Sequence, residues 1–140
     1  MKQDNTLPRS SNKNSKIGGS LKKALGSHVI LECYECNYGV INDVKKVEGI
    51  MIESALRSRA TIIQPFFHRF EPQGVTGVII IAESHFTVHT WPEYNYAAVD
   101  FFSCSDSINT NMAIDYILEN FESKRHNKRI IERGREYKTK

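Results

Sequence analysis

The sequence has no long apolar run, and this absence excludes several kinds of protein. Among its 140 residues, no hydrophobic stretch approaches the length that a bilayer-spanning helix needs, so we expect no contact with a membrane. Residues 1–16 are polar and lack the apolar core of a secretory signal peptide. We therefore predict a cytoplasmic protein whose thiols stay reduced.

Cysteine is scarce as well: the chain has three, and an odd number does not suit a disulfide scaffold. Cys33 and Cys36 form a C-x-x-C pair within a predicted strand, where their side chains would point to opposite faces. That arrangement holds no single ion without a bend in the strand. The pair also lacks the helix N-terminus that activates thiols in redox motifs. We predict that both cysteines are structural.

Neither sign of charge is in large excess, since 19 Lys and Arg face 16 Asp and Glu, a formal net charge of +3. The basic residues gather near the two ends, most densely over 124–140. Basic tails can bind nucleic acid through its phosphates. However, no aromatic stacking pattern or RNA-binding motif accompanies the charge. We predict solvated termini and no nucleic-acid partner.

The chain divides into a polar tail and one domain. Residues 1–20 are rich in Lys, Asn and Ser, and they cannot bury enough apolar surface to offset the entropy of ordering them. We predict that this tail is disordered. Residues 21–140 are predicted to form a single domain, for which their number is sufficient.

Two hydrophobic patterns alternate along this domain. Apolar residues recur at helical spacing from a cap at Asn42 or Asp43 to about Arg59, and again over 109–123. Runs of apolar and β-branched residues predict strands, and Pro65 reduces part of one to an edge or a bend. The predicted strands are 27–35, 60–70, 78–84, 85–91, 97–104 and 127–134.

The order of these elements, β-α-β-β-β-β-α-β, predicts the α+β class. We expect a two-layer α/β sandwich with a mostly antiparallel sheet and the helices on one face. Inward-facing helix residues are predicted to be Val44, Val47, Ile50, Met51, Leu56, Met112, Ala113, Tyr116, Ile117 and Leu118.

The stretch AESHFTVHTWPEY, residues 82–94, concentrates residue types that carry chemistry. His85 and His89 would converge on one metal ion if they lay on a helix, but their neighbours predict a strand. Four residues along a strand span about 13 Å, whereas zinc–ligand bonds are about 2 Å long. We therefore predict no metal site.

Ser84 raises the question of nucleophilic catalysis. It lacks the G-x-S-x-G elbow of the α/β hydrolases, and a hydrolase that uses Ser84 or Cys104 with His89 stays open as a weaker alternative. A serine hydroxyl can also attack the carbonyl of its own preceding residue, here Glu83. The resulting ester can undergo β-elimination, and the dehydroalanine left behind hydrolyses to a pyruvoyl group. That ketone is an electrophile and electron sink that ordinary side chains do not provide.

Three longer stretches carry a resemblance to a known family: FFHRFEPQGVTGVIIIAESHFTVHTWPEY, YAAVDFFSC and ERG. From about Leu25 to Arg135, the chain resembles the short prokaryotic S-adenosylmethionine decarboxylases, which are pyruvoyl-dependent and process themselves. The resemblance implies cleavage between Glu83 and Ser84. The products would be a β chain, 1–83, and an α chain, 84–140, that begins with the pyruvoyl group derived from Ser84.

The resemblance also implies roles for individual residues. His89 matches the histidine that promotes self-processing, and Cys104 matches the catalytic proton donor. Thr76 stands where related proteins have a serine that assists processing, and because it keeps the hydroxyl we expect processing to survive. The residues expected to bind the substrate's adenine and ribose are Phe70, Trp91 and Glu93.

The implied reaction is decarboxylation of S-adenosylmethionine. The substrate amine would form a Schiff base with the pyruvoyl carbonyl, CO2 would leave, and Cys104 would protonate the α-carbon. The product is an aminopropyl donor for spermidine synthesis. No metal or diffusible cofactor is implied. Active sites between protomers imply a homodimer of αβ units, or a higher oligomer.

Two other functions remain open at this stage. Some members of the family decarboxylate arginine or ornithine, but the presence of Phe70, Trp91 and Glu93 favours a nucleoside substrate. A basic, non-enzymatic binding module is the alternative from another class. It predicts an intact chain and strongly salt-dependent binding to an acidic partner.

Overall fold

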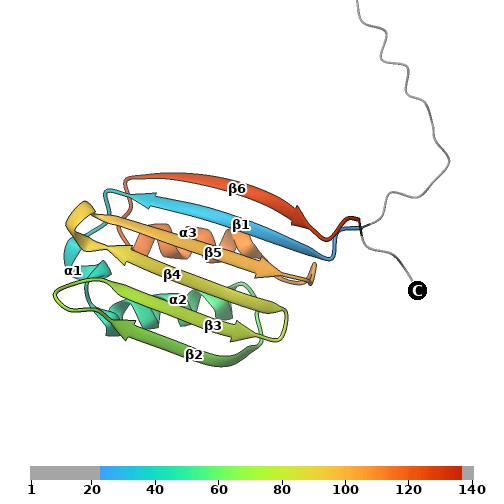
Figure 1. Cartoon of the computed structure of the whole chain (residues 1–140), viewed down its shortest axis with the longest axis horizontal. Helices are drawn as coiled ribbons and strands as arrows, with labels where there is room; N and C mark the ends of the chain where they lie inside the picture. Colours follow the sequence, from blue (N-terminus) through green and yellow to red (C-terminus); the bar gives the residue numbers. More distant parts are fainter. Residues whose placement is uncertain (1–22, 137–140) are drawn as a thin grey trace, which may run out of the picture.

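The computed structural model describes residues 23–136, so the predicted tail, 1–20, lies outside the described part. Six strands form one sheet in the order β2-β3-β4-β5-β1-β6, and every neighbouring pair is antiparallel (Figure 1). The strands are β1 (Gly26–Tyr34), β2 (Ile62–Arg69), β3 (Val75–Ile81), β4 (Ser84–Trp91), β5 (Tyr96–Ser103) and β6 (Arg125–Arg133). The strand that contains Pro65 lies at an edge, as predicted.

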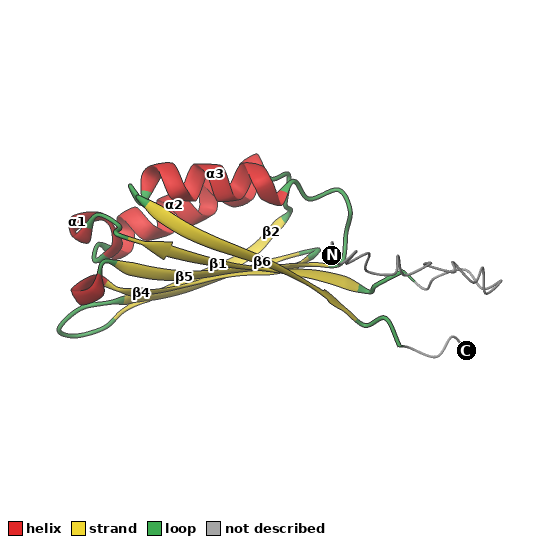
Figure 2. Ribbon diagram, turned by 90° about the horizontal axis from the view of Figure 1, so that it is seen from above, coloured by secondary structure: helices red, strands yellow, loops and turns green. Residues whose placement is uncertain are grey.

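Two long helices, α2 (Val44–Arg57) and α3 (Thr110–Asn120), lie side by side on one face of the sheet (Figure 2). The predicted two-layer sandwich of the α+β class is therefore confirmed. Both helices end two to three residues before the predicted ends, which is the usual uncertainty of helix boundaries. Two short elements were not predicted from the sequence: α1 (Tyr38–Ile41) and the 3-10 turn η1 (Pro92–Tyr94).

Side-chain caps decide where the long helices begin. The Asp43 carboxylate accepts hydrogen bonds from the N–H groups of Lys45 and Lys46, at 3.0 and 3.1 Å. The Asn42 side chain instead accepts from the N–H of Gly74, at 3.1 Å. Of the two caps that the sequence left open, Asp43 is therefore the one that begins α2.

The hydrophobic core lies between the helices and the sheet face that they cover. Val47, Met51 and Ile117 are fully buried there, as predicted. The prediction is wrong for Leu56 and Met112, which are 54% and 48% exposed. Leu56 follows the buried Ala55, and Met112 precedes the buried Ala113. One residue along a helix is a rotation of about 100°, which turns both side chains to solvent.

The side chains of Cys33 and Cys36 do not point to opposite faces of the sheet, so that prediction was wrong. β1 ends at Tyr34, and Glu35, with a φ of 53°, turns the chain before Cys36. Cys33 and Cys36 are both buried in the core, and both are free. Burial raises the pKa of both thiols, that of Cys36 to about 11. Both are therefore protonated near neutral pH, as expected of structural cysteines.

The second face of the sheet, here called the open face, has no helix over it within residues 23–136 (Figure 2). Strand alternation places every second side chain there. Large apolar side chains remain exposed on this face, among them Phe66, Ile80, Trp91 and Ile131.

None of the helices within residues 23–136 combines the length and the apolar character that a membrane-spanning helix needs.

Candidate active site

Ser84 begins β4 directly after a two-residue turn, Ala82–Glu83, and it pairs with Ile81 of β3. Two-residue hairpin turns generally place Gly, Asn or Asp at positive φ inside the turn. This turn contains none of them, and the positive φ, 145°, falls on Ser84 instead. A residue with a Cβ rarely adopts this conformation. Backbone strain therefore lies at Ser84, directly after the Glu83–Ser84 peptide bond.

The peptide that Ser84 would attack is held by a neighbouring strand. The N–H of Cys104 donates a hydrogen bond to the Glu83 carbonyl oxygen, at 2.8 Å. Cys104 lies there because Ser103, the last residue of β5, pairs with Ser84 across the sheet. An N–H donor at this oxygen would stabilise the negative charge that develops when a nucleophile adds to the carbonyl carbon. The thiol of Cys104 is exposed beside this bond.

His89 and Thr76, both of which the resemblance links to processing, are brought together by the sheet. They are paired residues of β4 and β3, and Thr76 Oγ1 lies 2.9 Å from His89 Nδ1. The hydroxyl thereby fixes the imidazole ring on the open face and leaves Nε2 as the nitrogen that can reach another group.

The three residues expected to bind a nucleoside lie at the same end of the sheet as His89. Trp91 is 40% exposed at the end of β4, Phe70 is 47% exposed just after β2, and Glu93 is exposed in η1. The Trp91 ring stacks on Tyr96 with centroids 5.4 Å apart, and Tyr96 stacks on Tyr34 at 5.5 Å. Partly exposed aromatic faces held in this way suit a planar ligand.

The stack of Trp91, Tyr96 and Tyr34 was not predicted from the sequence. Tyr96 also donates a hydrogen bond to the carboxylate of Glu32, and burial together with that bond raises the pKa of the Tyr96 phenol. Residues two apart on a strand point to the same face. This spacing was the available signal that Glu32 shares a face with Tyr34, and Tyr96 with Ala98. Their mutual contact needed the register of β1 on β5.

The predicted site residues form two groups, not one. Ser84 and His89 are five residues apart on one strand, which is about 16 Å at 3.3 Å per residue. We call the first group the cleavage half-site: Glu83, Ser84 and Cys104. We call the second the aromatic half-site: Phe70, Thr76, His89, Trp91 and Glu93. Within one chain the two half-sites lie at opposite ends of β4.

A third polar group lies on the open face beside Ser84. His28 Nε2 lies 3.0 Å from Asp100 Oδ1, and the Thr87 hydroxyl donates to the second Asp100 oxygen at 3.3 Å. His85 packs near them against Phe102, with ring centroids 5.6 Å apart. Partial burial lowers the pKa of His85, the nearby His28 lowers it further, and Asp100 opposes the shift. No local pattern indicates the pairing of His28 with Asp100, because they lie 72 positions apart in the chain.

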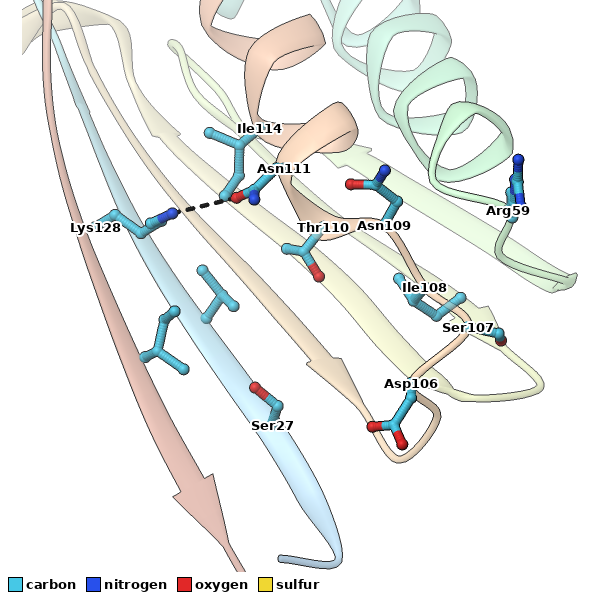
Figure 3. A pocket seen from close by; sticks show the side chains of 12 residues that line it. Ser27, Arg59, Asp106, Ser107, Ile108, Asn109, Thr110, Asn111, Ile114 and Lys128 are labelled. Atoms are coloured by element: carbon cyan, nitrogen blue, oxygen red, sulfur yellow. Dashed lines mark hydrogen bonds between the residues drawn. The ribbon is translucent and has the colours of Figure 1, made fainter.

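Within residues 23–136, neither a metal-binding cluster nor the cavity on the helix side coincides with the predicted site. Over residues 23–136, no group of three or more His, Cys, Asp or Glu side chains could hold a metal ion. A cavity of about 520 Å³ lies on the helix side, between α3 and the strands β1 and β6 (Figure 3). None of the predicted site residues lines it. Cys104 instead borders a smaller cavity of about 170 Å³.

Comparison with known proteins gives concordant results. A sequence model of the family described as S-adenosylmethionine decarboxylase matches residues 27–134. A relative from Moorella thermoacetica, named S-adenosylmethionine decarboxylase proenzyme, is 48% identical over 112 residues, 80% of this chain and 90% of the relative. One of the same name from Carboxydothermus hydrogenoformans is 50% identical over 111 residues, 79% of this chain and 87% of the relative.

The fold agrees with that of a solved structure. The adenosylmethionine decarboxylase from Aquifex aeolicus VF5 has a TM-score of 0.75 to this chain at 32% identity, and the match covers 84% of this chain and 99% of that one. The resemblance first seen in the E-S-H-x-T-x-H-T-W-P-E-Y run is therefore confirmed over almost the whole described part of the chain. The chain belongs to the S-adenosylmethionine decarboxylase family.

Proposed function

We propose that this protein is a proenzyme that cleaves itself between Glu83 and Ser84 and then decarboxylates S-adenosylmethionine. One observation carries the proposal: the backbone at Ser84 is strained, with φ 145°, and the Glu83 carbonyl oxygen directly before it accepts the Cys104 N–H at 2.8 Å. Strain raises the energy of the intact peptide, and the donor stabilises the charge that forms on attack. Both effects favour the internal reaction over an inert hairpin.

In the proposed processing, Ser84 Oγ adds to the Glu83 carbonyl carbon, and the C–N bond of the peptide breaks to give an ester. Loss of the Ser84 α-proton then expels the Glu83 carboxylate and leaves dehydroalanine. Water replaces the nitrogen of that residue, which departs as ammonia, and a pyruvoyl group remains. His89, oriented by Thr76 at 2.9 Å, is the group that we assign to proton transfer.

The pyruvoyl group supplies an electrophilic carbonyl and an electron sink for the loss of CO2. The chain's own residues bind and orient the substrate around it. Phe70 and Trp91 offer aromatic faces to the adenine and the sulfonium cation, and the Glu93 carboxylate suits the vicinal ribose hydroxyls. We assign to the exposed Cys104 thiol the return of a proton to the α-carbon. The presence of Phe70, Trp91 and Glu93, which suit a nucleoside, favours S-adenosylmethionine as the substrate over arginine or ornithine.

We propose that a homodimer of αβ protomers, or a higher oligomer, completes each site. The two half-sites lie about 16 Å apart on one strand, so His89 does not reach Ser84 of the same chain. Packing of two open faces with antiparallel β4 strands would bring the cleavage half-site of one chain to the aromatic half-site of the other. It would also bury apolar side chains such as Phe66 and Ile80, which are 65% and 45% exposed.

The proposal divides the chain at the cleaved bond. The β chain is 1–83, the α chain is 84–140, and both belong to one domain, 21–140. The pyruvoyl group derives from Ser84 and is covalent. A cytoplasmic location stays a prediction, because it rests on the composition of residues outside the described range.

Intact mass measured under denaturing conditions tests the proposal. Two chains separated at Glu83–Ser84, the smaller one blocked to amino-terminal sequencing, are the expected result. Decarboxylation assays with S-adenosylmethionine, arginine and ornithine then identify the substrate. A chain that keeps its full mass after long incubation would contradict the proposal and favour the binding module. Turnover of arginine or ornithine alone would overturn only the substrate.

A further inference from the structure

We propose that the side chain of Glu83 is a positioning group for self-cleavage, because it ties the strained turn to the backbone of Thr61. This inference rests on the proposed cleavage at Glu83–Ser84 and assigns a role to the carboxylate of the residue before the cut. The N–H of Thr61 donates to both Glu83 carboxylate oxygens, at 3.2 and 3.3 Å. Charge-assisted bonds of this kind are stronger than those between neutral groups.

Thr61 contacts the turn a second time. Its carbonyl oxygen accepts the N–H of Ala82, at 2.9 Å. Together with the bond from the Cys104 N–H to the Glu83 carbonyl, three contacts therefore hold a turn of only two residues. They come from opposite sides, since Thr61 precedes β2 and Cys104 follows β5. We call the pair of Thr61 contacts the Thr61 clamp.

The segment that carries the Thr61 clamp is itself fixed. The N–H of Ala60 donates to the Ala55 carbonyl at 3.0 Å, which ties the segment to the end of α2. The Ser58 carbonyl accepts the N–H of Asn109 at 2.9 Å, which ties it to the cap of α3. Ser58 is fully buried, and its hydroxyl donates to the Ala55 carbonyl at 2.7 Å. The clamp therefore acts from a rigid support.

A rigid clamp is what the geometry of Ser84 requires. A positive φ on a residue with a Cβ persists only where the surrounding structure over-determines it. The Glu83 peptide plane is held at its carbonyl by Cys104, and its side chain is held by Thr61. Two anchors on one residue restrict rotation about its Cα. They keep the carbonyl carbon where the Ser84 hydroxyl can add to it.

The test compares the rate of self-cleavage in two substitutions of Glu83, followed on freshly synthesised chains by denaturing electrophoresis. Glu83→Ala removes the acceptor, and we expect cleavage to slow roughly ten- to hundredfold. Glu83→Gln keeps one acceptor oxygen and is expected to remain within a few-fold of wild type. Glu53→Gln changes an exposed carboxylate on α2 and serves as the matched control, with no change expected. Thr61→Ala keeps the backbone N–H and should also cleave normally.

Hydroxylamine separates positioning from the later steps, because it cleaves the ester intermediate. If the clamp positions the peptide for attack, Glu83→Ala accumulates no ester, and hydroxylamine does not speed its cleavage. Build-up of a hydroxylamine-sensitive ester would instead place the defect at the elimination and overturn the inference. Equal rates for Glu83→Ala and wild type, or a Gln variant as slow as the Ala variant, would overturn it as well.

Amide exchange measured by NMR tests the clamp without cleavage. In a Ser84→Ala background, which keeps the chain intact, the Thr61 N–H should exchange slowly. Adding Glu83→Ala should speed that exchange selectively and leave core amides such as Leu31 protected. An unchanged Thr61 rate would show that the bond does not form. Failure of the wild-type chain to cleave would refute the proposed function, whereas normal cleavage of Glu83→Ala would refute only this inference.

Discussion

The two ends of β4 are built in different ways. At its first residue, Ser84, the reactive feature is backbone: a positive φ and a carbonyl bound by the Cys104 N–H at 2.8 Å. At its last residue, Trp91, the features are side chains: a half-exposed indole stacked on Tyr96, with His89 bonded to Thr76 near by. In the proposed function, one end holds the bond to be broken, and the other presents surfaces for the ligand.

This contrast teaches how the two half-sites respond to change. Backbone geometry at the cleavage half-site depends on neighbours from several strands, so a substitution there acts on processing. In the aromatic half-site, Phe70, Trp91 and Glu93 are exposed, so a substitution of one of them acts on binding and leaves the fold intact. His89 and Thr76 of the same half-site are assigned to processing, which they would serve across the dimer. The sheet also separates the ends, and one chain alone does not unite them.

The largest effect is expected from mixed dimers, since it is all or none. A Ser84→Ala chain and a His89→Ala chain are co-expressed with different tags. If His89 acts across the dimer, the His89→Ala chain is cleaved when mixed and stays intact alone. Mass spectrometry of the separated chains gives the result.

The matched control is a partner that carries both substitutions and therefore supplies no His89. It should leave the His89→Ala chain intact. If the first mixture also stays uncleaved although mixed dimers form, the two half-sites do not meet across an interface. The contrast between the two ends of β4 would then have another explanation.

Substitution of Trp91 should change affinity and leave processing in place. Loss of a base–aromatic stack costs about 1–3 kcal/mol, so we expect Trp91→Ala to raise the KM for S-adenosylmethionine about five- to 150-fold. Trp91→Phe keeps an aromatic face and should lie between. Tyr94→Ala, which removes a neighbouring ring that is 74% exposed, is the control and should behave as wild type. An unchanged KM for Trp91→Ala would remove this residue from the binding site.

A smaller effect is expected at Thr76. Thr76→Val keeps the shape and removes the hydroxyl that lies 2.9 Å from His89 Nδ1. A hydrogen bond of this kind contributes about 0.5–1.5 kcal/mol, so cleavage should slow about two- to twelvefold. Thr76→Ser restores the hydroxyl and should restore the rate. If both variants cleave at the wild-type rate, Thr76 does not orient His89 for processing.

The smallest effect concerns His85, beside the cleavage end. Burial lowers the pKa of His85 in the folded chain, so the unfolded chain binds the proton first as pH falls. The contribution of neutral His85 to stability is complete above about pH 6.5, the unfolded pKa, and is lost as pH falls toward the lower folded pKa. Urea unfolding of the Ser84→Ala chain at pH 7.5 and 5 measures this loss.

His85→Gln should reduce the difference in unfolding free energy between those two pH values. His126→Gln, on the exposed strand β6, should leave it unchanged. If His85→Gln shows the same pH dependence as its parent, the titration of His85 does not contribute to stability. The loss would then have to come from other groups.

Much of this architecture was predictable because it is local. Asp43 caps α2 through bonds from the N–H groups of Lys45 and Lys46, close by in the chain, and alternating apolar residues mark β4 and β5 wherever they lie in the fold. The roles of Ser84, His89 and Cys104 were implied by the resemblance of their stretches to the S-adenosylmethionine decarboxylase family. Errors arose where contact geometry decides: Leu56 against Ala55 on one helix, or Cys36 beyond the turn at Glu35.

The six strands, the two long helices, their order and the sandwich class follow from short-range sequence pattern, and the residues of the candidate site follow from the family motif. The tertiary structure decided the rest. It divided the site residues between two ends of one strand, placed the Cys104 N–H on the Glu83 carbonyl, and joined Thr61 to Glu83 and His28 to Asp100. These contacts depend on strand register and sheet order. Register emerges only when a whole hydrophobic face is buried at once, and no local stretch of sequence encodes it.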